Sequence, residues 1–195
     1  LVPSHPFYSL QADVKIEFCL AKQSPEGKST NGIMRHNGEQ AAWSAEAFDT
    51  HVMPATIWDP SKYLNIWTTT FATPDEETLG YATFPDLATS QKDGMVIGAT
   101  YFGTEGNLEE GAELNRTATH EVGHYLGLSH IWGDETCGDD LVDDTPTQYE
   151  ANTSICPTFP HNAKSECNPG ANGEMYMNYM DYTTDNCMQL FTTGQ

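Results

Sequence analysis

The chain contains the stretch His120-Glu121-Val122-Gly123-His124-Tyr125-Leu126-Gly127-Leu128-Ser129-His130, and this stretch decides the fold. Apolar residues recur at helical spacing over 114–126, which predicts an amphipathic helix. Within that helix His120 and His124 are four residues apart, so both imidazoles lie on the same face. Gly127 can adopt the left-handed conformation that ends a helix and turns the chain. His130 can therefore approach the same ion from a second direction.

These three histidines have the composition of a catalytic zinc site. Three neutral imidazoles leave one position of a tetrahedral zinc ion open to water, whereas structural zinc sites are closed by four protein ligands. Glu121, beside the first histidine, can face the space next to the ion without binding it. It could take a proton from water as the water attacks a carbonyl carbon, and pass that proton to the leaving amine. The alternative interpretation of the same residues is a domain that binds zinc but no longer cleaves a substrate.

The composition restricts the other functions that are open to the chain. Its 195 residues correspond to one domain, and 28 acidic against 8 basic residues give a formal net charge of −20. A nucleic-acid binder or an anionic-membrane binder needs a basic surface, so we expect neither partner. Apolar residues make up 38% and aromatic residues 11% of the chain, which is enough to build a core. No apolar run approaches the length of a membrane span.

Periodicity predicts an α+β fold. Strand-like alternation or β-branched content occurs in residues 14–20, 63–70 and 95–102, and residues 39–48 favour a helix. Strands followed by the helix that carries the histidines suggest a mixed sheet with helices packed against it. After His130 the regular signals fade, so we expect the last third of the chain to be irregular.

The cysteines indicate an oxidising compartment. Four of the five lie in the last third of the chain, at Cys137, Cys156, Cys167 and Cys187. This distribution suggests two local disulfides and a secreted or extracellular protein, although four cysteines allow three pairings. The fifth, Cys19, lies in a predicted strand, and we expect a buried free thiol there.

An acidic run follows the third histidine. Residues 134–150 contain seven acids and no lysine or arginine. Oxygen ligands at this density suit calcium, and a solvated acidic loop is the alternative. An irregular region of this length needs disulfides or ions to hold it together.

The segment Asn178-Tyr179-Met180-Asp181-Tyr182 places Met180 fifty residues after His130. Together with the histidine motif, it resembles the metzincin clan of zinc endopeptidases, in which a Met-turn methionine lies beneath the zinc. The stretches that narrow the resemblance to the pappalysin family are His130-Ile131-Trp132-Gly133, Asp144-Thr145-Pro146, Met177 to Tyr182 and Phe191-Thr192-Thr193-Gly194-Gln195.

The resemblance implies one metzincin catalytic domain over residues 1–195. Residues 1–130 would form an upper subdomain with the zinc helix, and residues 131–195 a lower one with the Met-turn, with the active-site cleft between them. Met180 would be the Met-turn methionine, and Tyr182 would contact the metal or the tetrahedral intermediate.

The resemblance also implies further site residues. Residues 95–100 would be near the upper rim, where an antiparallel edge strand binds extended substrate through positions such as Gly98 and Ala99. Asp185 would lie in the pocket that receives Arg or Lys. The pairs Cys137–Cys167 and Cys156–Cys187 would form the disulfides. One or two calcium ions would bind in the lower part, with Asp140, Asp143 and Thr145 as ligands.

We therefore expect a secreted, monomeric zinc metalloendopeptidase that cleaves proteins or peptides, with a preference for bonds before Arg or Lys. His120, His124 and His130 would hold one catalytic zinc ion. Two alternatives stay open: a non-catalytic binding domain stabilised by zinc and calcium, and a calcium-binding adhesion module for which zinc is dispensable.

Overall fold

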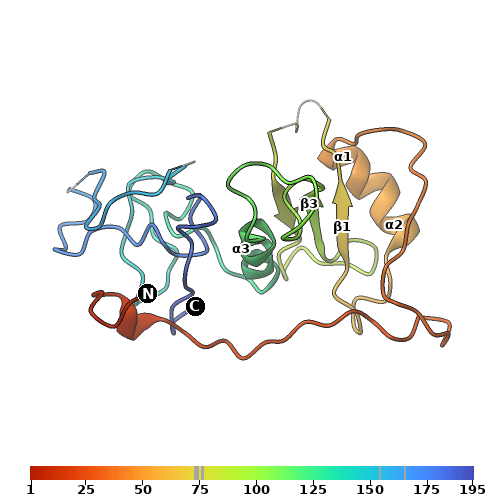
Figure 1. Cartoon of the computed structure of the whole chain (residues 1–195), viewed down its shortest axis with the longest axis horizontal. Helices are drawn as coiled ribbons and strands as arrows, with labels where there is room; N and C mark the ends of the chain where they lie inside the picture. The colour runs from red at the N-terminus through yellow and green to blue at the C-terminus, as the bar shows by residue number, and fades with distance from the viewer. Residues whose placement is uncertain (73–74, 76, 154, 165) are drawn as a thin grey trace.

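The structure is a computed structural model, and it describes residues 1–72, 75, 77–153, 155–164 and 166–195. Figure 1 shows that most regular elements gather in one half of the molecule, whereas the other half consists of loops apart from a short helical turn near the N-terminus. The regular half comes from residues 45–125. None of the helices in the described part of the chain has the length and apolar character of a membrane-spanning segment.

A continuous helical stretch opens the regular half. It consists of α1 (Ala45–Ala47), a π-helical turn η2 (Phe48–Val52) and α2 (Met53–Thr56). The Ser44 side chain accepts a hydrogen bond from the Ala47 N–H and so caps the first turn. The helix predicted over residues 39–48 thus begins later and extends further, because the cap determines where it starts.

Three short strands form a mixed sheet in the order β1-β3-β2. Strand β1 (Ile66–Thr69) runs parallel to β3 (Met95–Gly98), and β2 (Gly80–Ala82) runs antiparallel to it. Strand β3 is buried along its whole length. The predicted strands at 63–70 and 95–102 are therefore present in shortened form. The sequence patterns missed β2, which has only three residues and begins with a glycine.

The sheet is covered on both faces. Successive side chains of β3 point to opposite faces: Met95 and Ile97 pack with Ala118 of α3 (Arg116–Tyr125), whereas Val96 packs with Phe48 of the helical stretch. This arrangement places α3 directly against β2 and β3. The predicted α+β fold, with helices packed on a mixed sheet, is confirmed.

The loop half has its own core and covalent links. Buried apolar side chains from distant parts of the chain meet there, including Phe7, Ile131 and Leu190. Disulfides join Cys137 to Cys167 and Cys156 to Cys187, which is the pairing that the family resemblance implies. A short 3₁₀ helix, η1 (Tyr8–Leu10), brings the N-terminal segment against this half.

Residues 14–20 do not form the predicted strand. They run as an irregular, exposed segment along the lower edge of the molecule in Figure 1, and no described strand pairs with them. Cys19 is consequently exposed and not buried. The prediction was wrong because alternating residues only suit a strand, whereas a strand forms when a neighbour completes its hydrogen-bond ladder.

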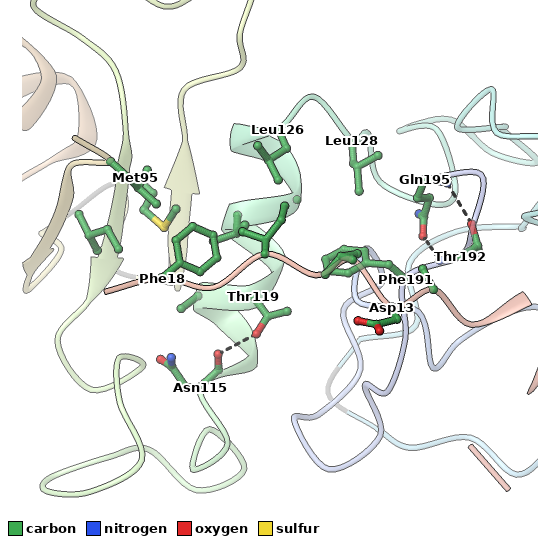
Figure 2. A pocket seen from close by; sticks show the side chains of 18 of the residues that line it. Asp13, Phe18, Met95, Asn115, Thr119, Leu126, Leu128, Phe191, Thr192 and Gln195 are labelled. Atoms are coloured by element: carbon green, nitrogen blue, oxygen red, sulfur yellow. Dashed lines mark hydrogen bonds between the residues drawn. The ribbon is translucent and has the colours of Figure 1, made fainter. Parts of the chain in front are cut away.

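This segment borders an apolar cavity of about 710 Å³. Figure 2 shows Phe18, Met95 and Thr119 around it, with the C-terminal residues Phe191 and Thr192 at one end. The helix residues that line the cavity lie on the face of α3 opposite His120 and His124. The large cavity is therefore distinct from the site that the histidines form.

Candidate metal centre

Helix α3 positions the first two histidines. Both His120 and His124 are buried. The His120 Nδ1–H donates to the Tyr179 carbonyl at 2.7 Å, and the His124 Nδ1–H donates to the Leu128 carbonyl, also at 2.7 Å. A carbonyl oxygen can only accept, so each Nδ1 must carry the proton and each Nε2 must present a lone pair.

The turn after α3 brings in the third histidine. Gly127 has a φ of +100°, and its N–H bonds to the His124 carbonyl while the Leu128 N–H bonds back to the Gly123 carbonyl. This is the hydrogen-bond pattern with which helices commonly end at a glycine. It reverses the chain so that His130 returns to the exposed end of the first two imidazoles.

Two side chains that the sequence analysis did not identify hold His130. Its Nδ1–H donates to the Asp134 carboxylate at 2.6 Å, and its ring stacks on Trp132 with 4.3 Å between centroids. Asp134 follows His130 by four residues, so this spacing was the signal that could have revealed it. All three histidines thus have an Nδ1 partner, which leaves all three Nε2 atoms free to bind a metal.

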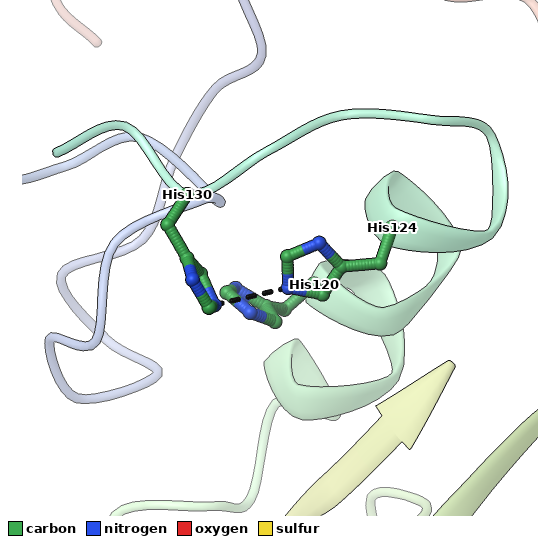
Figure 3. A group of neighbouring side chains, drawn as sticks. All are labelled: His120, His124 and His130. Atoms are coloured by element: carbon green, nitrogen blue, oxygen red, sulfur yellow. Dashed lines mark hydrogen bonds between the residues drawn. The ribbon is translucent and has the colours of Figure 1, made fainter. Parts of the chain in front are cut away.

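The three imidazoles converge on one point, as Figure 3 shows. Their ligand atoms all lie within 4.8 Å of one another, and the Nε2 atoms of His124 and His130 are 3.0 Å apart. Two lone pairs directed at each other would repel, whereas a cation between them would bind both. The donor set of three neutral imidazoles fits zinc.

The pKa values support neutral ligands. Burial, together with the neighbouring imidazoles, lowers the pKa of His120 to about 3 and that of His124 to about 4. Burial also lowers the pKa of His130, although Asp134 opposes this effect. Protonation would block a metal-binding nitrogen, so these shifts keep the imidazoles available at neutral pH.

Glu121 lies in a buried position beside the cluster. Its side chain is 5% exposed, and its Oε2 has no hydrogen-bond partner among the described residues. Burial raises the pKa of Glu121 to about 8. A Cβ atom added to Gly80 of β2 would lie 3.1 Å from Glu121 Oε1, so the carboxyl lies against the face of that strand. An unpartnered carboxyl oxygen in such a place suggests a proton acceptor.

Tyr182 lies on the other side of the cluster. Its hydroxyl is 2.9 Å from His130 Nε2, and its ring packs edge-on against Trp132. Burial, aided by nearby acids such as Glu121, raises the pKa of Tyr182 to about 12. The phenol therefore stays protonated at neutral pH and can donate a hydrogen bond near the metal position.

Met180 lies beneath α3. It is fully buried, and a Cβ atom at Gly123 would overlap its sulfur, so the glycine is what allows this approach. The Ile131 N–H donates to the Met180 carbonyl at 3.1 Å, which links the segment after His130 to residues 178–182. We call residues 178–182 the Met-turn segment below.

Asp181, inside the Met-turn segment, is the centre of a buried polar network. Its carboxylate accepts bonds from the backbone N–H groups of Asn152 and Tyr182 and from the side-chain amides of Asn152 and Gln148. The network ties Tyr182 to the loop around residue 150. Asp181 belongs to the sequence motif around Met180, but its role depends on distant donors that no local pattern reveals.

The acidic run places its members in different surroundings. Asp140 is buried, its Oδ1 accepts from the Val142 N–H and from the Thr145 hydroxyl, and its Oδ2 has no partner among the described residues. Asp143 is exposed on the same loop. Asp144 accepts from the Thr192 hydroxyl and the Gly194 N–H, so it holds the C-terminal residues instead.

Two of the predicted substrate-binding residues, Gly98 and Ala99, do not lie at a free edge of the sheet. Strand β3 is paired on both sides, so residues 95–98 are the centre of the sheet and the prediction of an edge strand there was wrong. The N–H groups of Gly98 and Ala99 donate to the carbonyls of Leu79 and Thr69 and are not free for a substrate. The antiparallel edge is β2. Asp185 is buried at the amino end of α3.

The fold and the site together define the metzincin class of metallopeptidases. Its features here are a mixed sheet packed on a helix that carries two histidines, a third histidine after a glycine turn, and a methionine beneath them. A family model of the M43 peptidases, described as Pregnancy-associated plasma protein-A, matches residues 47–195. The chain belongs to this family. The resemblance to pappalysins that the sequence motifs indicate is thereby confirmed. The predicted enzyme class, metallopeptidase, is the class of the family to which the chain belongs.

Relatives and solved structures agree with this assignment. The chain is 34% identical over 160 residues to an extracellular metalloprotease of Verticillium alfalfae, covering 78% of this chain and 53% of that protein. It is 42% identical over 125 residues to an extracellular metalloprotease of Arthroderma otae, covering 60% and 43%. The chain thus spans about half the length of these fungal relatives.

Among solved structures, Tannerella forsythia mature mirolysin in complex with a cleaved peptide superposes with a TM-score of 0.88 and 41% identity, covering 98% of this chain and 72% of that one. The relatives' names and the two disulfides confirm the predicted extracellular location.

Proposed function

We propose that this chain is the catalytic domain of a secreted zinc metalloendopeptidase that hydrolyses peptide bonds of proteins or peptides. The observation that carries the proposal is the convergence of three proton-free Nε2 atoms beside Glu121, whose buried Oε2 has no partner among the described residues. His120, His124 and His130 would hold the ion. Bound zinc would supply Lewis-acid polarisation of the substrate carbonyl and would acidify water at its open position.

Glu121 acts as general base and then as general acid. Its carboxylate accepts a proton from the attacking water and delivers that proton to the leaving amine. Burial favours the protonated carboxyl in the protein alone, and a divalent cation beside it favours the ionised form that this step needs. Tyr182, which keeps its proton, donates a hydrogen bond to the oxyanion that develops on the substrate carbonyl.

The free edge of β2 is the proposed place for the substrate backbone. Residues 80–82 pair only with β3 among the described strands, and Gly80 lies against Glu121. An extended peptide that adds to this edge would bring its carbonyl groups past the general base. We further propose a preference for cleavage before Arg or Lys, because a net charge of −20 attracts basic substrates.

We also propose that the domain divides into an upper subdomain of residues 1–130 and a lower one of residues 131–195. We propose further that the chain is a monomer and that it binds neither nucleic acids nor membranes. The change from regular to irregular structure after α3 supports the boundary near His130.

A calcium ion in the lower subdomain is also proposed. The buried Asp140 Oδ2 has no hydrogen-bond partner among the described residues, although Val142 and Thr145 engage the other oxygen. A buried carboxylate oxygen without a partner is costly unless a cation neutralises it. Asp143 and Thr145 would complete the site from the same loop.

Glu121→Gln tests the proposed reaction, because the amide keeps the shape of the side chain and removes the base. We expect this variant to bind zinc as the wild type does and to lose about 1000-fold in kcat on a peptide library. Glu17→Gln is the matched control, since Glu17 is exposed on the segment that lies away from the histidines. Wild-type chain that binds zinc but cleaves nothing would instead support the non-catalytic binding domain.

A further inference from the structure

Strand β2 is the edge strand on which the substrate backbone is proposed to bind, and other strands hold it on one side only. It has three residues and pairs with β3 alone among the described strands. Such pairing fixes the register of a strand, but the twist between neighbouring strands varies from about −10° to about −35°. The tilt of β2 therefore also depends on what its side chains contact.

The two faces of β2 contact different layers of the molecule, because successive side chains of a strand point to opposite faces. Gly80 lies against the Glu121 carboxyl, and Ala82 packs in the apolar cluster beside α3. Tyr81 points the other way and packs in the apolar cluster beside the helical stretch of residues 45–56. A side chain that holds β2 from this second face can therefore fix the strand without lying among the histidines and Glu121.

The Tyr81 hydroxyl makes a polar link on that second face. It donates to Asp49 Oδ1 at 2.7 Å, and the Ala45 carbonyl oxygen lies 3.4 Å from the same hydroxyl. The other carboxylate oxygen of Asp49 accepts from the Lys92 ammonium, which lies in the segment between β2 and β3. Burial, together with the bond to Asp49, raises the pKa of Tyr81, so the phenol remains a donor. One carboxylate thus joins β2, and the segment that follows it, to the helical stretch.

We propose that Asp49 and Tyr81 form a positioning pair: their hydrogen bond holds β2 against the helical stretch in the orientation in which its free edge accepts a substrate backbone. A hydrogen bond to a carboxylate is stronger than one between neutral groups and weakens steeply when its geometry is lost, so it opposes tilting of the strand. The effect on cleavage rests on the proposed function, whereas the effect on β2 itself does not.

Tyr81→Phe tests the pair, because it keeps the ring in its cluster and removes only the hydroxyl donor. We expect amide hydrogen exchange in residues 79–83 to quicken about tenfold, while exchange in α3 stays at the wild-type rate. Tyr63→Phe is the matched control. The Tyr63 hydroxyl donates to the Gln23 carbonyl at 3.0 Å, away from β2, so its loss should leave exchange in residues 79–83 unchanged.

Peptide cleavage gives the second readout. A peptide on the free edge holds β2 from its other side, so the cost of ordering a loose β2 falls on binding and not on the later chemical step. We expect Tyr81→Phe to raise KM for a labelled peptide about tenfold and to keep kcat within about twofold of wild type. A side chain that only stabilises the fold would lower the melting temperature and leave KM and kcat at wild-type values.

Asp49→Asn is the conservative variant, since its amide oxygen can still accept from the Tyr81 hydroxyl. Exchange in residues 79–83 and KM should stay within about threefold of wild type. Exchange in Tyr81→Phe that equals wild type in residues 79–83, or that quickens equally throughout the chain, would overturn the proposal, and so would an unchanged KM. If the wild-type chain cleaves nothing, the proposed function fails, and hydrogen exchange alone decides whether the pair holds β2.

Discussion

The two halves of the molecule are stable for different reasons. In residues 45–125 helices and a sheet supply regular backbone hydrogen bonds, and the core lies between layers around Val96 and Ile97. In residues 126–195 neither α-helix nor β-strand is found in the described part, and the core is joined by two disulfides. There, buried carboxylates such as Asp181 and Glu174 accept from backbone N–H groups. In the loop half, side chains thus supply hydrogen-bond partners for backbone groups, whereas in the other half helices and strands supply many of these partners.

The position of the proposed active site at the junction of these halves follows from this difference. The helix in the regular half provides two histidines whose spacing is determined by local geometry. The loop half provides His130, Tyr182 and Met180, whose positions depend on long-range links. Loss of order in the loop half should therefore damage the site while the sheet and α3 survive.

Removal of a disulfide should have the largest effect on the stability of the loop half relative to the regular half. Each closes a loop with a sequence separation of 30 or 31 residues, and loss of such a link costs about 3–4 kcal/mol. We expect Cys156→Ser combined with Cys187→Ser to unfold residues 126–195 first, as measured by limited proteolysis with mass spectrometry. Cys19→Ser is the control. Cuts that appear first within residues 45–125 would contradict the division into two regions.

Asp181→Ala should have the next largest effect. It leaves buried donors from Asn152 and Gln148 without an acceptor, and the loss in the free energy of unfolding should be about 3 kcal/mol. Asp49, in the regular half, accepts from Tyr81 and Lys92 but is less buried, so Asp49→Ala should cost about 1 kcal/mol. Urea denaturation measures both. Equal losses would show that buried acids are no more important in the loop half.

Calcium should stabilise the loop half by a smaller amount. A site saturated to about a hundred times its Kd contributes about 2.7 kcal/mol. We expect the melting temperature to rise as calcium is added to calcium-free protein in the presence of zinc, and Asp140→Asn to abolish the rise. Asp13→Asn, at an exposed acid near the N-terminus, should respond like wild type. A melting curve that calcium leaves unchanged would rule out the site.

The pH dependence of stability should show the smallest effect. Burial, which outweighs the hydrogen bonds from Asn152, Tyr182 and Gln148, raises the pKa of Asp181 to about 6. The folded chain therefore binds this proton more tightly than the unfolded chain, so the associated stability is full below the ordinary pKa and is lost as the pH rises through 6.

The Asp181→Asn variant has no titrating group at this position. Subtracting its stability from that of the wild type at each pH therefore removes the contribution of the other acids. The stability of wild type relative to this variant should fall by about 1 kcal/mol between about pH 5 and pH 7. Thermal melts across this range measure the difference. A gap that widens with rising pH would mean that the four donors outweigh burial.

Local patterns predicted the parts of the fold that local geometry controls. The helix over 114–126 was found at 116–125, because helical periodicity involves residues only three or four apart. The histidines come together because Gly127 is suited to end that helix. The alternating residues 14–20 failed as a strand, and the three-residue β2 was missed, because pairing depends on neighbours that are distant in the sequence.

The residue types and their spacing alone determined that this chain carries three imidazoles and a carboxyl suited to a catalytic zinc site. They also determined that the last third of the chain needs cross-links, because it lacks the periodicity of helices and strands. Only the tertiary structure decided that β2 is the antiparallel edge strand of the sheet, that Asp181 joins Tyr182 to the loop around residue 150, and that Asp185 accepts from the N–H group at the start of α3. Each of these depends on which distant backbone or side-chain group reaches a given atom, and residue spacing along the chain does not encode that contact.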